Sequence, residues 1–129
     1  MFYAFSYTPV NSDPVPAAYK LDLPLTTGVI HQVDVLFQNG CAHKEYVQIW
    51  HANHQLWPSN RGEKLRGNAT VVSFREFYEL IPGHTNLHAM IWTDLKTDNA
   101  EIIVQIGLLP KRIIQPMSFD ELLSAAKGY

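Results

Sequence analysis

The sequence predicts an all-β protein, an antiparallel β-sandwich of about seven or eight strands with a short C-terminal helix. Short segments rich in aromatic and β-branched residues alternate apolar with polar side chains, which is typical of half-buried strands. Turn residues separate these segments at short, regular intervals. Nothing resembles the strand–helix alternation of a parallel sheet. Jelly-roll and immunoglobulin-like topologies both stay open.

The first two expected strands lie at residues 1–8 and 18–25. The first is aromatic and alternates only weakly. The second carries leucines on one face, and Pro24 indicates an edge position or a strand end. Two prolines in the intervening NSDPVP segment break regular structure. We therefore treat residues 1–17 as an N-terminal arm that pairs with its own sheet or with a neighbouring molecule.

The middle of the chain has the clearest strand signals. Residues 29–37 place alternate apolar side chains, from Val29 to Phe37, on one face. Residues 46–57 predict two strands around a turn at residues 52–54. Since this stretch carries two of the three tryptophans, we expect it at the centre of the core.

Three more strands are expected at residues 70–80, 86–93 and 101–109. The first of them has a confused phase, because Val72 and Phe74 share a face on which Phe77 does not lie. A β-bulge near Arg75-Glu76 would repair that phase.

The C-terminal tail, residues 111–129, has a different pattern. Ser118 and Glu121 fit a capping box, with serine at the N-cap and glutamate three residues later. An apolar run and a terminal Lys127-Gly128 follow, which predicts a short helix. Because a helix of this length is unstable alone in water, we expect it to dock on its own sheet or on another subunit.

Composition is consistent with one domain over residues 1–129 and excludes several classes of protein. The net charge is −2, and Lys111-Arg112 is the only basic cluster, so nucleic-acid binding is not expected. One cysteine rules out an intrachain disulfide. No apolar run is long enough to enter a membrane, and no signal peptide is evident. We expect a soluble protein that is intracellular or part of a virion.

Histidines are the candidate metal ligands, since imidazole suits zinc and iron. They occur as two weak pairs, His51 with His54 and His84 with His88. A cupin-like site needs an HxH pair with a nearby glutamate, and that pattern is absent. Along a strand, residues three apart face opposite sides, so only the turn could bring His51 and His54 together. We predict no cofactor and keep a cupin-like metal enzyme as the weakest alternative.

Two other catalytic patterns have weak support. Cys41 and His43 are close in sequence, but no third orienting group is indicated, so a structural cysteine is favoured. Glu76 and Glu79 are an odd number of residues apart and should lie on opposite faces of a regular strand, unlike a glycosidase pair. Phosphate-binding glycine motifs are absent. We therefore predict that the protein is not an enzyme.

Aromatic side chains give the alternative function, a carbohydrate or small-ligand binding module. Flat indole rings pack on sugar rings, whereas most large aromatic side chains are buried in the core. The candidate ligand-binding residues are Trp50, His51, His54, Trp57 and Trp92.

The favoured function is a non-enzymatic structural or interaction protein that forms a homo-oligomer. Terminal arms beside a compact β-domain can add to a neighbour's sheet or groove. Its expected partners are further copies of itself and other assembly subunits, as in virus or phage capsid, decoration and tail components. This comparison rests on the fold class alone. The expected interface residues are Phe2, Tyr3, Phe5, Phe119, Leu122 and Leu123.

Overall fold

The computed structural model describes residues 1–10, 13, 18–95 and 97–110. These residues contain eight β-strands and no helix. The strands are β1 (Phe2–Tyr7), β2 (Tyr19–Pro24), β3 (Gly28–Phe37), β4 (Glu45–His51), β5 (His54–Trp57), β6 (Thr70–Leu80), β7 (Asn86–Thr93) and β8 (Ile102–Leu109). The expected C-terminal helix and the whole tail 111–129 lie outside the described residues.

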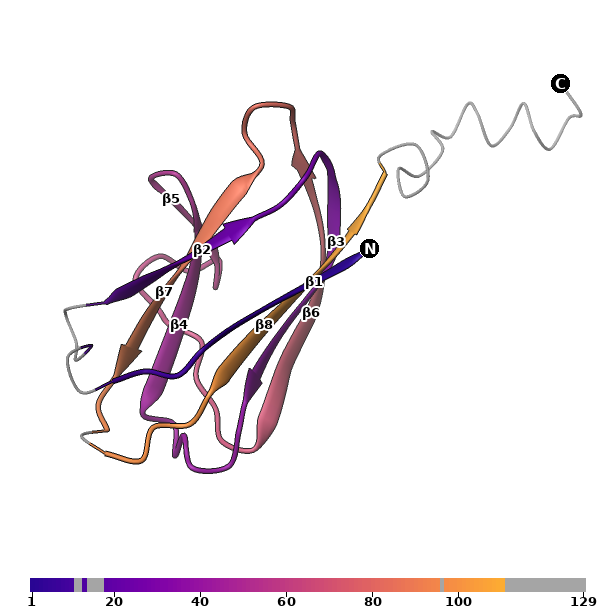
Figure 1. Cartoon of the computed structure of the whole chain (residues 1–129). Helices are drawn as coiled ribbons and strands as arrows, with labels where there is room; N and C mark the ends of the chain where they lie inside the picture. The colour runs from indigo at the N-terminus through magenta and orange to yellow at the C-terminus, as the bar shows by residue number, and fades with distance from the viewer. Residues whose placement is uncertain (11–12, 14–17, 96, 111–129) are drawn as a thin grey trace, which may run out of the picture.

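The strands form two four-stranded antiparallel sheets, which agrees with the predicted all-β class (Figure 1). The first sheet has the order β1-β8-β3-β6, and the second has the order β2-β7-β4-β5. Strands distant in sequence are therefore neighbours: β1 pairs with β8, β2 with β7 and β3 with β6. No helix among the described residues has the length and hydropathy needed to cross a membrane.

The described part of the N-terminal arm belongs to the protein's own first sheet. Residues 2–7 pair with β8 along their full length. The amino group of Met1 extends this pairing by donating to the carbonyl oxygen of Leu108 at 2.8 Å. Because β1 fills this edge, β8 is paired on both sides.

The two sheets share one hydrophobic core, built from alternate residues of nearly every strand. β3 and β8 contribute Val33, Val35, Val104 and Ile106, and the second sheet contributes Val47, Ile49 and Ile91 from the opposite side. Each such side chain contributes roughly 1.5–3 kcal/mol of burial free energy. Trp57 of β5 closes one flank, with its ring 5.6 Å from Phe74 and 6.0 Å from Tyr78, both on β6.

The register of the first sheet breaks where the sequence predicts a bulge. Ile30 pairs with Tyr78 and Gln32 pairs with Arg75, so Glu76 and Phe77 lie opposite the single residue His31. The side chain of Phe77 still points outward at this break, as its exposed fraction of 52% shows. The apolar residue that confused the phase is therefore a surface residue.

Candidate functional site

The tryptophan–histidine set expected to bind a ligand does not form one site. Trp57 is 4% exposed and belongs to the core cluster. Trp92 is 8% exposed on the outer side of the second sheet, where the ammonium group of Lys64 lies 4.9 Å from its ring centre. Only Trp50 of the three is partly exposed. The sequence shows that these residues are strand residues, but it does not show which loops cover them.

His51 and His54 pair directly across the β4–β5 turn, which consists of Ala52 and Asn53. The turn therefore brings them together, as the spacing requires. Nδ1 of His51, however, lies 2.6 Å from the hydroxyl of Tyr78 on the other sheet, whereas His54 is exposed. The His51 contact is a bridge between the sheets rather than an open ligand position.

His84 and His88 lie around the start of β7, with His84 in the turn before it. Both line the same surface hollow as His51. Within the described part of the chain, no group of three or more His, Cys, Asp or Glu side chains is arranged to hold a metal ion.

Of the expected ligand-binding residues, Trp50 lies on the outer side of the second sheet and lines a surface hollow there, which adjoins a second one. We call this surface the Trp50 face and define it by Lys20, Asp22, Trp50, Asn53, His88 and Met90. Pairing aligns Asp22, His88 and Trp50 in one row across three strands. The rings of Trp50 and His88 are nearly parallel, 15° apart, with centres separated by 6.3 Å.

Trp50 is held by its own strand. Its Nε1–H donates to Oε1 of Gln48 at 2.9 Å, and Nε2 of Gln48 donates to the carbonyl oxygen of Glu63 at 2.8 Å. The polar edge of the indole is thus satisfied inside the protein, and its ring is fixed in orientation.

The partly buried position of His88 lowers the pKa of its imidazole. Desolvation lowers its pKa below the ordinary 6.5, and the neighbouring Lys20 and His51 lower it further, while Asp22 opposes them. The imidazole is therefore neutral at pH 7, and it offers one donor and one acceptor.

The expected interface residues are separated by the strand alternation of β1. Phe2 points outward and is 67% exposed. Tyr3 and Phe5 are partly buried against the core, so they face their own second sheet rather than a neighbour. Phe119, Leu122 and Leu123 lie outside the described residues.

The outer side of the first sheet adds apolar residues that the sequence analysis did not select. Val71 and Phe77 of β6 are 51% and 52% exposed. Their alternation with core residues was visible in the sequence, but an alternation cannot say whether its outer face is covered. A hollow of about 640 Å³ beside Phe77 is lined also by Phe2, His31 and Arg75.

His31 lies tightly in this region. The ring of Phe2 contacts it edge-on, with centres 5.7 Å apart, and Gly107 lies beneath both rings. A Cβ at Gly107 would lie 2.7 Å from Phe2 and 2.8 Å from Nε2 of His31. That nitrogen is buried and has no hydrogen-bond partner among the described residues.

Cys41 is a buried structural residue. Its Sγ donates to Oε2 of Glu45 at 3.2 Å, and burial raises the pKa of the thiol to about 12. His43 takes no part in this contact and is exposed. A thiol with such a pKa is not a nucleophile at neutral pH.

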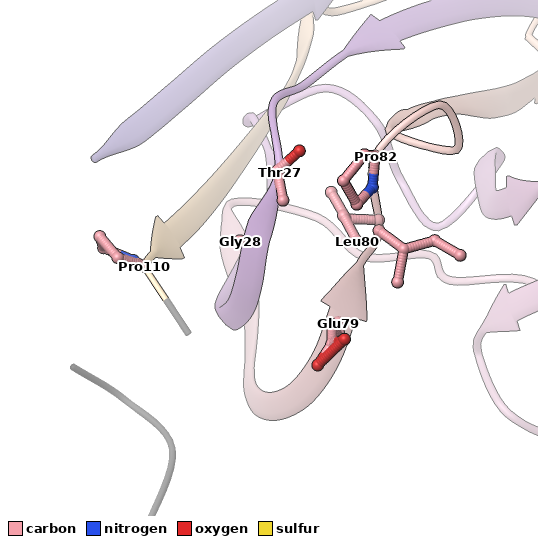
Figure 2. Close-up of a pocket in the computed structure, with 7 residues that line it drawn as sticks. Thr27, Gly28, Glu79, Leu80, Pro82 and Pro110 are labelled. Atoms are coloured by element: carbon pink, nitrogen blue, oxygen red, sulfur yellow. The ribbon is translucent and has the colours of Figure 1, made fainter. Parts of the chain in front are cut away.

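The two glutamates of β6 do not form a catalytic pair. Glu79 is exposed on the outer side of the strand, whereas Glu76 alternates with it and is partly buried. Glu79 instead borders an apolar hollow of about 430 Å³ at one end of the sandwich (Figure 2). The other residues that line this hollow come from the β2–β3 connection and the start of β3, from the end of β6 and the turn after it, and from Pro110, and none of them is ionisable.

No protein-family model, no curated protein and no solved structure matches the chain.

Proposed function

We propose that the protein is a non-enzymatic interaction protein that self-associates through the outer side of its first sheet. The observation that carries this proposal is the exposure of Phe2, Val71 and Phe77 on that one side. Leu36 and Ile103, partly buried, continue the row of Val71 across the same side, and the polar residues Ser73, Asp34 and Gln105 form the next row toward Phe77. Exposed large apolar side chains gathered on one face of a soluble domain are typical of an interaction surface.

β6 adds a second supporting feature. It has eleven residues and is the edge strand of the first sheet. A long edge strand presents unpaired backbone groups, which another copy of the chain can pair with. The apolar side chains Val71 and Phe77 lie on this same strand, so one contact can use both the edge and the face.

The strand order supports a more specific proposal, that the fold is a jelly roll. The neighbours β1–β8, β2–β7, β3–β6 and β4–β5 are those of an antiparallel ribbon wrapped into two sheets. Jelly rolls form viral capsid subunits as well as lectin domains and cupins. We infer a virion-type component, in a capsid, decoration or tail, as the assembly that best suits a small self-associating subunit of this order.

The solution mass tests the self-association. Size-exclusion chromatography with light scattering, over a range of concentrations, should give a multiple of the 14.7 kDa chain mass. Phe77→Asp should shift the protein toward the monomer, because an aspartate at the interface must be desolvated. A wild-type monomer at every concentration would refute the proposal.

A matched control separates this contact from a general effect of charge. Val10→Asp places the same charge on an exposed apolar residue that lies outside the strands. It should leave the mass unchanged. Circular dichroism should show both variants folded, since substitutions at exposed positions change stability little. Equal masses for wild type and Phe77→Asp would show that the first sheet is not the interface.

A further inference from the structure

The Trp50 face contains two adjoining surface hollows. A hollow of about 260 Å³ is lined by Trp50, Ala52, Asn53, His88 and Met90. It adjoins a larger hollow of about 730 Å³ that shares four of these residues and extends over Lys20 and Asp22. The two together make one depression, lined by residues of the second sheet and of the β4–β5 and β6–β7 turns.

One ring at this depression is suited to stacking. Because Gln48 satisfies the indole nitrogen, the part of Trp50 that borders the hollow serves as an apolar surface. His88 lies beside it with a nearly parallel ring. Met90, the next outward residue on β7, lines both hollows and extends the apolar floor. Flat aromatic surfaces of this kind bind ligands through apolar faces and need no charge.

Asn53 lines the same hollow as Trp50, and Asp22 and Asn86 line the adjoining larger hollow. Among the described residues, the side chains of Asp22, Asn53 and Asn86 make no intramolecular hydrogen bond, although all three line the depression. An asparagine amide supplies two donors and one acceptor oxygen, and a carboxylate supplies acceptors. The ligand must therefore offer several hydrogen-bonding groups of both kinds around an apolar face.

The charges of the residues that line the depression further restrict the class of ligand. Lys20 and Asp22 carry opposite formal charges at the same depression, so they cancel. His88 is neutral at pH 7, as its lowered pKa requires. A phosphate or an oligocation would meet one unfavourable charge for each favourable one, whereas a neutral ligand meets neither penalty.

We propose that the Trp50 face is a binding site for a neutral carbohydrate. A pyranose ring lies on the indole of Trp50, and its hydroxyls exchange hydrogen bonds with Asn53, His88 and Asp22. Trp57 and Trp92 take no part, since Trp57 is buried in the core and Trp92 is 8% exposed with the ammonium group of Lys64 over its ring. This site does not depend on the proposed self-association, which uses the opposite sheet.

The test is binding of a panel of neutral oligosaccharides, such as cello-, xylo-, manno-, malto- and chito-oligosaccharides, measured by isothermal titration calorimetry. At least one member should bind the full chain with a dissociation constant of about 1 mM or tighter, the weak end of measurable affinities. Trp50→Ala should weaken that binding by about tenfold or more, the equivalent of one good contact.

Two further variants keep the result interpretable. Asn53→Ala should weaken the same binding while leaving the indole in place. Glu101→Gln, which removes an exposed carboxylate next to β8 and outside both hollows, should not change it. Circular dichroism spectra should match between all variants. The proposal is overturned if no oligosaccharide binds at 10 mM, a concentration about tenfold above the expected dissociation constant. It is also overturned if Trp50→Ala binds as well as wild type.

Discussion

Glu45 is a buried acidic residue whose pKa the fold alters. Its side chain is fully buried in β4. Oε1 accepts from the backbone N–H of Ala100 at 2.8 Å, and Oε2 accepts from the Cys41 thiol at 3.2 Å. Burial raises the pKa of this carboxyl above the ordinary 4.5, and the two hydrogen bonds offset only part of that effect. The residue ties the loop before β8 to the second sheet.

Glu45→Gln should therefore change the pH dependence of stability. Because the folded pKa lies above the unfolded value, the stability that Glu45 provides is complete below pH 4.5 and is lost as pH rises through the folded pKa. Each unit of such a difference corresponds to about 1.4 kcal/mol. The glutamine variant stays neutral, so its unfolding free energy relative to wild type should rise between pH 4.5 and 8.

Urea denaturation across that pH range measures the difference. Glu63→Gln is the control, because it removes a carboxylate that is exposed. It should show no comparable trend. If the difference between Glu45→Gln and wild type were the same at pH 4.5 and 8, the buried carboxyl would not be the titrating group.

At this scale the sequence gives residue types but not their environments. Trp50 and Trp57 lie in one hairpin with the same side chain, yet Trp57 packs on β6 and Trp50 faces outward. Their difference comes from a register shift in the hairpin between Ile49 and Trp50, which places Trp57 opposite Ile49 on the inner side. No pattern in the local sequence specifies that shift.

Individual strands were the most predictable level. The expected ranges 70–80 and 86–93 coincide with β6 and β7, and residues 29–37 differ from β3 by one residue. These agreements arise because apolar–polar alternation and turn residues are local signals. The β4–β5 turn is two residues long, shorter than the expected 52–54, because His54 already pairs with His51.

The hairpin gives a prediction at the scale of the element. Trp57→Ala should cost about 3–5 kcal/mol of unfolding free energy, as expected for a large core side chain that leaves a cavity. Trp50→Ala should cost about 1 kcal/mol or less, because partly exposed positions outside the core tolerate truncation better than core positions. Urea denaturation followed by far-ultraviolet circular dichroism compares the two.

Trp57→Leu provides a milder variant if the alanine protein does not fold. Its cost should still exceed that of Trp50→Ala. Similar costs for the core and surface tryptophans would contradict the assigned register of β5.

At the scale of the whole molecule, the strand order was beyond the sequence. β1 and β8 are almost the full described chain apart, with Phe2 opposite Gly107. Local patterns cannot identify such partners, because any apolar face of similar length would satisfy the alternation. The exposure of the outer faces could not be predicted for the same reason: whether Phe77 is covered depends on which distant segment packs over that side of the sheet, and Phe77 remains 52% exposed.

This topology makes a kinetic prediction. Because the first sheet requires contacts between residues up to 107 positions apart in the sequence, loop-closure entropy must be lost before those contacts form. Refolding should therefore take about milliseconds to seconds, the range of proteins dominated by non-local strand pairs. Stopped-flow fluorescence after dilution from urea measures it, with Trp57 as the reporter because it becomes buried only when β5 packs on β6. The Trp50→Phe variant removes the signal of the partly exposed indole, leaves the buried Trp57 and Trp92 as reporters, and should give the same rate. Refolding that is complete within the dead time of the instrument would mean that the pairing of β1 with β8 does not limit folding.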